Sequence, residues 1–452
     1  MERNANSRHT RPGIVPPALL YYNRASNNHK GREHMDTKAV RLYGKRDLRL
    51  ETFALPPLKD DEILVRIVSD SLCMSSYKAA EQGETHKRVP GGIAENPVII
   101  GHEFCGEIVE AGKKWADEWS AGEKFSIQPA INYKGSPAAV GYSYEFIGGC
   151  MTYAIVPNEY IEEGCLLHYG GEAFFYGSLA EPMSCIAGAF HASYHTSAGS
   201  YTHRMGIVNG GRMAILAGAG PMGLGAADYA LHGGRKPSVL VITDIDNARL
   251  SRAAELITVE EAARVGVRLH YVNTKNIGDA AEYLTDLAGG GFDDVFVFAP
   301  VAGVVELGDG ILGQDGCLNF FAGPTDRAFA AKLNFYNVHY NASHIAGTSG
   351  GNTDDMIESL RLMESGAINP AAMITHIGGL GSAASATLNL PGIPGGKKLI
   401  YTHIDLPLTA IDDMKDHEDP ALRRAHEIVK RHGGLWCAEA EAFLLGAKKQ
   451  EA

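Results

Sequence analysis

Three short stretches of this chain carry side chains of the kinds that ligate zinc. Cys73 offers a thiolate, His102 within Gly101-His102-Glu103 offers an imidazole, and Glu181 offers a carboxylate. A catalytic zinc takes three such protein ligands and leaves one position open for water or substrate. These residues therefore predict a metal centre. We expect Glu103 to lie beside the metal, either as an orienting group or as an occasional fourth ligand.

A glycine-rich loop supplies a second kind of chemistry. It follows the apolar run Met213-Ala214-Ile215-Leu216-Ala217, precedes a helical segment, and fits the pattern G-x-G-x-x-G. Such glycines allow a tight turn, let the backbone approach a pyrophosphate and let the helix pack closely on the strand, while the helix N-terminus favours phosphate. The predicted cofactor-binding residues of this loop are Gly218, Gly220, Pro221, Met222 and Gly223.

Asp244 ends the next apolar run, 21 residues beyond Gly223. A carboxylate there accepts hydrogen bonds from the adenosine ribose and repels a 2′-phosphate, which favours NAD(H). Arg249 lies close enough in sequence to accommodate that phosphate, so NADP(H) is not excluded. Zinc and a nicotinamide coenzyme together predict hydride transfer between an alcohol and a carbonyl group.

The bulk properties restrict the partners. The 452 residues suffice for two domains, and the net charge of -12 disfavours broad contact with nucleic acid or an anionic membrane. No run approaches the roughly 18 apolar residues of a membrane span. The seven cysteines are scattered without a CxxC pair, which indicates free thiols and a cytoplasmic location.

The character of the chain changes along its length. Residues 1–34 are polar and aperiodic, and we interpret them as a disordered extension. Short strand-like segments occupy most of residues 35–190, and strands alternate with helices over residues 191–349. Residues 350–452 mix strands and helices, and we expect this part of the chain to return to the first domain. The prediction is an α/β protein with an irregular β-rich catalytic domain and a doubly wound parallel sheet of Rossmann type.

The order of these motifs resembles that of the zinc-dependent medium-chain dehydrogenases, whose catalytic domain is GroES-like. The resemblance covers nearly everything from Met35 onward. Glu181-Pro182 is similar to the polyol (sorbitol) dehydrogenase branch. The blocks that carry the resemblance are Cys73-Met74-Ser75-Ser76-Tyr77-Lys78, Gly101-His102-Glu103, Gly149-Cys150-Met151-Thr152-Tyr153-Ala154-Ile155-Val156-Pro157, Glu181-Pro182-Met183-Ser184 and Ala217-Gly218-Ala219-Gly220-Pro221-Met222-Gly223.

Longer blocks resemble the L-sorbose-1-phosphate reductase family. They include His86-Lys87-Arg88-Val89-Pro90, Asn319-Phe320-Phe321-Ala322-Gly323-Pro324 and Gly347-Thr348-Ser349-Gly350-Gly351-Asn352. This resemblance implies reduction of L-sorbose 1-phosphate to D-glucitol 6-phosphate by NAD(P)H. It also implies a homo-oligomer, either a dimer or a tetramer.

Two departures from the wider superfamily matter. The stretch between Ser126 and Gly149, which often carries four cysteines for a structural zinc, has none, so we expect one catalytic zinc only. Alcohol dehydrogenases place a histidine three residues after a serine or threonine, whereas this chain has Ser75 and Lys78. Ser75 keeps the hydroxyl that passes the alcohol proton outward, and Lys78 either relays it with a lowered pKa or binds an anion.

A phosphorylated substrate also needs cationic donors away from the metal. Lys78, Lys87 and Arg88 fall between the first two predicted ligands and are the candidates. Two alternatives stay open: a polyol dehydrogenase acting on another sugar or sugar phosphate, and a non-catalytic NAD-binding member of the superfamily.

Overall fold

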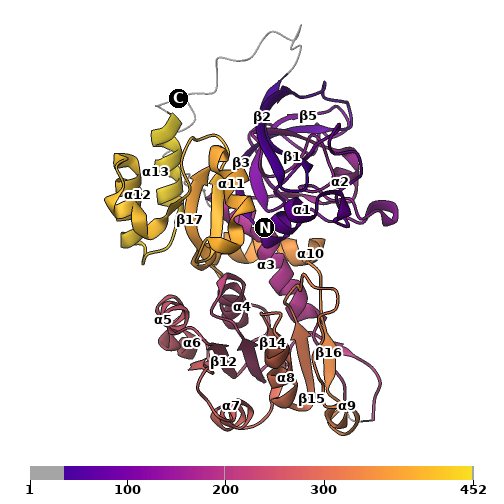
Figure 1. Ribbon diagram of the computed structural model, residues 1–452, viewed down its shortest axis with the longest axis vertical. Coiled ribbons are helices and arrows are strands. Elements are labelled where there is room, and N and C mark those ends of the chain that lie inside the picture. The colour runs from indigo at the N-terminus through magenta and orange to yellow at the C-terminus, as the bar shows by residue number, and fades with distance from the viewer. Residues whose placement is uncertain (1–34, 198, 450–452) are drawn as a thin grey trace, which may run out of the picture.

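A computed structural model describes residues 35–197 and 199–449, so the predicted extension at residues 1–34 lies outside the described residues. Two lobes follow one another along the long axis of the molecule, and a long helix connects them (Figure 1). One lobe combines strands from the beginning and the end of the chain, and the other contains the middle of the chain (Figure 1).

The first lobe is built on an eight-stranded sheet with the order β19-β17-β18-β3-β5-β6-β8, in which β7 pairs with β3. A three-stranded sheet, β2-β1-β4, lies in the same lobe. The strands are β1 (Asp36–Gly44), β2 (Asp47–Ala54), β3 (Ile63–Leu72), β4 (Val98–Ile99), β5 (Phe104–Ala111), β6 (Lys124–Ile127), β7 (Tyr153–Val156), β8 (Leu166–His168), β17 (Ile374–Gly379), β18 (Lys397–Tyr401) and β19 (Thr409–Ala410).

The second lobe is a six-stranded parallel sheet with the order β13-β12-β11-β14-β15-β16. The order reverses between β11 and β14, and ligands of open α/β sheets bind at the carboxyl ends of strands at such a switch point. Its elements are β11 (Arg212–Leu216), α4 (Pro221–His232), β12 (Val239–Asp244), α5 (Asn247–Leu256), α6 (Val259–Arg264), β13 (Arg268–Asn273), α7 (Ala280–Ala288), β14 (Phe292–Val297), α8 (Ala302–Gly310), β15 (Leu312–Phe320), α9 (Phe335–Tyr340) and β16 (His344–Ala346).

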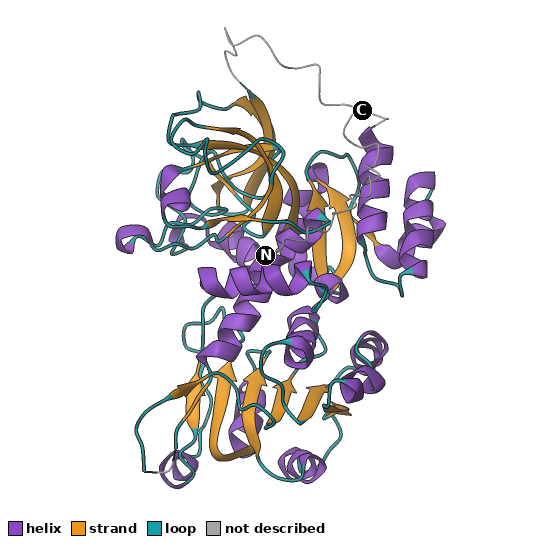
Figure 2. Ribbon diagram, turned by 180° about the vertical axis from the view of Figure 1, so that it is seen from behind, coloured by secondary structure: helices purple, strands orange, loops and turns teal. Residues whose placement is uncertain are grey.

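The remaining helices gather around the first lobe and at the junction of the two lobes (Figures 1 and 2). They are α1 (Met74–Gln82), α2 (Asn158–Glu162), α3 (Phe174–Ala192), α10 (Thr353–Glu364), α11 (Leu380–Leu388), α12 (Pro420–Arg431) and α13 (Ala438–Lys449). A short ribbon, β9 (Tyr194–His195) with β10 (Arg204–Met205), follows α3 and contacts β15 and β16 of the second lobe. The predicted fold class, a β-rich domain with a doubly wound parallel sheet, is confirmed.

Helix α3 carries Glu181 and packs against both lobes. It contacts β3 and β5 on one side and α4 and α10 on the other. Ala173 precedes the helix and offers no side-chain cap. Glu441, buried on α13, replaces the cap by accepting the N–H groups of Phe174 at 2.6 Å and Phe175 at 2.9 Å. The C-terminal helix thereby stabilises the start of the helix that bears Glu181.

Strand β18 brings a late part of the chain to the end of β3. The two strands pair antiparallel, with Lys398 opposite Leu72. Lys397 therefore lies opposite the position that Cys73 occupies directly after β3. No sequence pattern links these two residues, which are joined only by the register of the sheet.

Candidate active site

The Gly101-His102-Glu103 turn needs a glycine at its first position. Gly101 has a φ of +93°, and a Cβ atom there would lie 2.5 Å from Oδ2 of Asp70 and 2.7 Å from the Cys150 nitrogen. The turn enters β5 and points His102 and Glu103 toward the end of β3, where Cys73 stands before α1. Sheet register and a glycine turn thus bring the first two predicted ligands together.

The donor atoms of Cys73, His102 and Glu103 all lie within 4.8 Å of one another. Within residues 35–197 and 199–449, this is the one group of three or more metal-ligating side chains that approach so closely. Glu181 is not part of this tight group, but its charge acts on the Cys73 thiol and it feels the charge of Glu103. Thiolate, imidazole and carboxylate donors in a secluded site suit zinc.

In the metal-free protein, burial controls the protonation of these groups. It raises the pKa of Cys73 to about 12 and, with the charge of Glu103 adding to the effect, raises the pKa of Glu181 to about 8. Burial also lowers the pKa of His102 to about 4, so the imidazole is neutral and able to donate a lone pair. A metal cation bound between these side chains would offset the cost of burying the Cys73 thiolate and the Glu181 carboxylate.

Glu103 is held by Lys397. The Lys397 ammonium lies 2.5 and 2.6 Å from the two carboxylate oxygens, and both side chains are buried. Burial alone would raise the pKa of Glu103, but the charges of Lys397 and His102, together with hydrogen bonds from Lys397 and Ser71, hold that pKa below its usual value. Glu103 is therefore an ionised group whose oxygens are shared with a cation.

Two side chains that the sequence reasoning did not identify contact His102. Its Nδ1 lies 3.3 Å from the Ser76 hydroxyl, and its Nε2 lies 3.2 Å from the Tyr142 hydroxyl. The predicted relay residue, Ser75, is half-buried and interacts with the Tyr142 phenol. Tyr142 thus links Ser75 to His102, and no spacing pattern in the sequence could have found it.

The three predicted phosphate-binding cations occupy different surroundings. Arg88 is half-buried with its guanidinium 5.7 Å from the centre of the Tyr142 ring, against which His86 stacks. No carboxylate of the described residues forms an ion pair with Arg88. Lys87 is exposed, and Lys78 donates to the Gly323 carbonyl at 2.9 Å, across from α1 to the loop after β15.

The glycine loop has the form that a dinucleotide requires. A Cβ atom on Gly223 would lie 2.0 Å from the Gly218 carbonyl oxygen, so only glycine lets α4 approach the end of β11. A Cβ atom on Gly220 would meet nothing within 4 Å, so the space in front of it is open. Pro221 is the first residue of α4, where its missing N–H costs nothing.

Asp244 lies buried at the end of β12, facing the glycine loop. Its carboxylate accepts the N–H of Ala219 at 3.3 Å and those of Ile245 and Asp246 at 2.8 and 3.1 Å. Arg249 lies on α5, is largely exposed and pairs with Asp246 at 3.9 Å. The Asp244 carboxylate thus contacts the glycine loop through the Ala219 N–H, and Arg249 follows on the next helix.

Comparison with known proteins agrees with this geometry. Residues 59–164 match the family described as alcohol dehydrogenase GroES-like domain, and residues 221–365 match the family described as zinc-binding dehydrogenase. An L-sorbose 1-phosphate reductase of Klebsiella pneumoniae is 50% identical over 410 residues, which are 90% of this chain and 97% of the relative. The chain belongs to the zinc-dependent medium-chain dehydrogenases.

Other members of the family are similar as well. A mannitol-1-phosphate 5-dehydrogenase of Aliivibrio fischeri is 53% identical over 90% of this chain and 97% of its own length. The crystal structure of 2R,3R-butanediol dehydrogenase from Bacillus subtilis superposes with a TM-score of 0.65 at 19% identity, covering 81% of this chain and all of that one. The predicted family and enzyme class, a zinc-dependent oxidoreductase of the alcohol and polyol dehydrogenase type, are confirmed. Zinc and a nicotinamide dinucleotide are the cofactors of this family.

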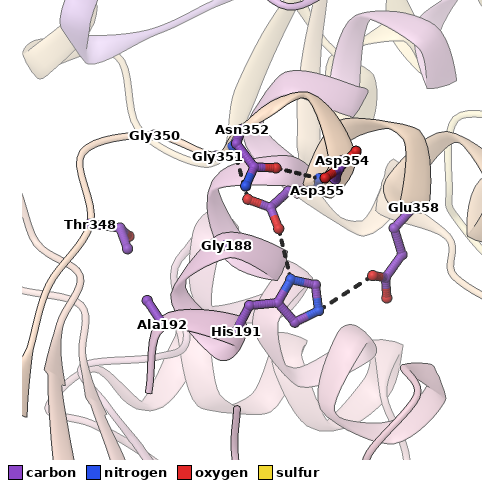
Figure 3. A pocket seen from close by; sticks show the side chains of 10 residues that line it. All are labelled: Gly188, His191, Ala192, Thr348, Gly350, Gly351, Asn352, Asp354, Asp355 and Glu358. Atoms are coloured by element: carbon purple, nitrogen blue, oxygen red, sulfur yellow. Dashed lines mark hydrogen bonds and ion pairs between the residues drawn. The ribbon is translucent and has the colours of Figure 1, made fainter. Parts of the chain in front are cut away.

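A pocket of about 520 Å³ lies between α3, α10 and the loop that precedes α10, and none of the residues that line it belongs to the group Cys73, His102 and Glu103. Figure 3 shows His191 between two acidic side chains there: Nδ1 is 2.7 Å from Asp355 and Nε2 is 3.3 Å from Glu358.

Among the described residues, no helix combines the length and apolar composition that crossing a membrane requires.

Proposed function

We propose that this dehydrogenase reduces a ketose phosphate with NAD(P)H. The observation that carries the proposal is the position of Arg88, a half-buried cation without a carboxylate partner on the Tyr142 ring, whose hydroxyl contacts His102. An arginine placed in this way binds phosphate through paired N–H donors. Two relatives, both 50% identical or more, are named as enzymes of sugar phosphates.

For the metal we propose Cys73, His102 and Glu181 as the ligands. Glu103 orients the site and is an occasional fourth ligand, because Lys397 already engages both of its oxygens. When bound, zinc supplies a Lewis acid for the substrate carbonyl and the coenzyme supplies the hydride. The residues of the chain then hold the reactants and move the proton.

Ser75 is the group that we propose to deliver the proton to the reduced oxygen. It is half-buried, two residues beyond Cys73, and interacts with the Tyr142 phenol. Lys78 is engaged with the Gly323 carbonyl of the other lobe, so we assign it to the contact between lobes in this conformation. We keep Lys78 and Lys87 as secondary candidates for the phosphate, because one is engaged and the other is exposed.

The proposed coenzyme preference is NAD(H). Asp244 is buried beside the glycine loop with a carboxylate that disfavours a 2′-phosphate, while Arg249 is paired with Asp246. NADP(H) remains an alternative that depends on Arg249 leaving that pair.

The proposed substrate is L-sorbose 1-phosphate, with D-glucitol 6-phosphate as product. A second candidate, another sugar phosphate or polyol, is favoured by the mannitol-1-phosphate 5-dehydrogenase that is 53% identical. The deciding experiment follows NADH and NADPH oxidation with saturating L-sorbose 1-phosphate, L-sorbose and D-fructose 6-phosphate, with and without a chelator. Chelator-sensitive turnover of L-sorbose 1-phosphate alone supports the first candidate, and preference for D-fructose 6-phosphate supports the second. Turnover of L-sorbose alone would contradict a phosphate-binding role for Arg88.

We also propose that the chain divides into a first part of the catalytic domain (residues 35–190), a dinucleotide-binding domain (191–349) and a second part of the catalytic domain (350–452). Self-association and a cytoplasmic location are two further proposals. Exposed apolar side chains on α9 and the edge strand β16, among them Phe335, Tyr336 and Ile345, favour contact with a second copy. The seven free cysteines favour a reducing compartment. Light scattering of the purified protein tests the self-association, and a monomer at micromolar concentration would contradict it.

A further inference from the structure

A carboxyl group without a cationic partner lies directly behind the Gly101-His102-Glu103 turn. Asp70, on β3, has no exposed surface. No ion pair joins it to a cation in the described part of the chain, and the nearby Lys397 is bonded to Glu103. Burying such a group is costly unless hydrogen bonds satisfy it. A buried Asp at this position therefore needs a role other than packing.

Both oxygens of Asp70 are used by the backbone and side chains around the turn. Oδ1 accepts the N–H of Glu103 at 3.3 Å, and Oδ2 accepts the thiol of Cys150 at 3.2 Å. Oδ1 of Asp70 thus contacts the backbone of Glu103, whose side chain belongs to the group of metal-ligating residues.

Two glycines enclose the carboxyl group. A Cβ atom on Gly149 would lie 2.1 Å from Oδ1, and one on Gly101 would lie 2.5 Å from Oδ2. The Gly149 N–H also donates to the Gly101 carbonyl at 2.7 Å, which joins the two glycine segments. The space fits this side chain and leaves little freedom for it to move.

We propose that Asp70 is a positioning residue for the metal centre. Its carboxyl group fixes the backbone from which His102 and Glu103 project, and the Cys150 thiol fixes the carboxyl group in turn. The Lys397 ammonium binds the Glu103 carboxylate, and the Asp70 carboxyl group accepts the Glu103 backbone N–H. This inference rests on the ligands proposed above, and partners of this kind alter metal affinity or activity about 10- to 100-fold when they are removed.

The test compares Asp70→Ala and Cys150→Ala with Asp70→Asn, whose amide oxygen still accepts the Glu103 N–H. The matched control is Asp309→Ala, since Asp309 is also buried and accepts a backbone N–H, that of Asn334 at 2.8 Å, in the other lobe. Measurements are the visible spectrum of the cobalt-substituted protein, the rate of zinc loss to a chelator, and kcat and KM for NADH.

Asp70→Ala should lose zinc about tenfold faster, shift the cobalt bands and lower kcat about 10-fold or more with KM for NADH unchanged. Asp70→Asn should stay within about threefold of the unaltered protein by every measure, and Cys150→Ala should fall between them. Cobalt bands and zinc loss in Asp70→Ala that match those of Asp309→Ala would overturn the proposal. If Asp70→Ala does not fold, unaltered cobalt bands in Cys150→Ala overturn it instead.

Hydrogen exchange of the metal-free protein separates this inference from the proposed function. The amide of Glu103 should exchange about tenfold faster in Asp70→Ala than in Asp70→Asn, because only the latter keeps the acceptor. Equal exchange in the two variants contradicts the role of Asp70. An unaltered protein that binds no zinc contradicts the proposed function alone.

Discussion

The Lys397 ammonium lies within 2.6 Å of both carboxylate oxygens of Glu103, although 294 residues separate them in sequence. Both side chains are buried, so neither charge can be compensated by water if the other is removed. The pair makes the C-terminal part of the chain a component of the candidate active site. Its loss has a measurable consequence.

Lys397→Met should lower the free energy of unfolding by about 3–5 kcal/mol, because it leaves the Glu103 carboxylate buried and unpaired. The double variant Lys397→Met with Glu103→Gln should recover much of that loss. Lys113→Met is the control, since its pair with Asp60 is largely exposed and contributes about 0–1 kcal/mol. Urea titrations of the metal-free proteins make the comparison, and equal losses for Lys397→Met and Lys113→Met would show that the buried pair is unimportant.

Arg88→Ala should raise KM for a phosphorylated ketose roughly 10- to 150-fold, as expected for losing charge-assisted hydrogen bonds. The unphosphorylated ketose should be affected by less than about twofold. Lys87→Ala, at the exposed neighbouring position, should leave both values nearly unchanged. Steady-state kinetics on matched substrates decide this, and equal effects of Arg88→Ala on both ketoses would remove Arg88 from the phosphate site.

Two glycines of the same loop should respond to alanine in opposite ways. Gly220→Ala should leave the thermal stability unchanged, since its φ of -83° suits alanine and the space is open, but it should weaken coenzyme binding about tenfold or more. Gly223→Ala should lower the free energy of unfolding by about 1–3 kcal/mol through the clash with Gly218. Calorimetric melting and titration with NADH separate the two effects, and a destabilised Gly220→Ala protein with normal coenzyme affinity would refute the assignment.

His191 should make stability depend on pH. The hydrogen bond to Asp355, reinforced by the charge of Glu358, raises the pKa of His191 above its ordinary value of 6.5 (Figure 3). Its contribution to folding is therefore fully present below about pH 6.5 and is lost as the pH rises through the folded-state pKa. The stability difference between the unaltered protein and His191→Gln should be larger at pH 5.5 than at pH 8.5.

Urea titrations of both proteins at each pH measure this difference. Glu358→Gln should reduce the effect only in part, because Asp355 is the stronger cause and its helix-capping bonds with Asn352 are preserved. A difference that stays constant between the two pH values would contradict the role given to His191.

Local patterns in the sequence predict the parts of the protein that local geometry controls. The glycine loop before α4 and the Gly101-His102-Glu103 turn are such parts, because backbone conformation and close approach demand glycine there. The fold class follows from the alternation of strands and helices in the second lobe. The family is recognised from the order of these motifs.

Contacts between distant segments leave no local pattern. The hydroxyl of Tyr142 against His102 and the carboxylate of Glu441 at the start of α3 are set by tertiary packing. The sequence spacing singles out Ser75, yet the neighbouring Ser76 is the residue whose hydroxyl meets the His102 ring. Lys397 is placed beside Glu103 only by the pairing of β18 with β3.

The cap that Glu441 places on α3 has a consequence for the order in which the molecule is made. On the ribosome, Phe174 is synthesised 267 residues before the side chain that accepts its N–H. At about 5–20 residues per second, the helix that bears Glu181 waits roughly 13 to 53 s for that partner. Lys397 also arrives late, so the active centre is completed only when nearly the whole chain has emerged, well after both sheets have most of their strands.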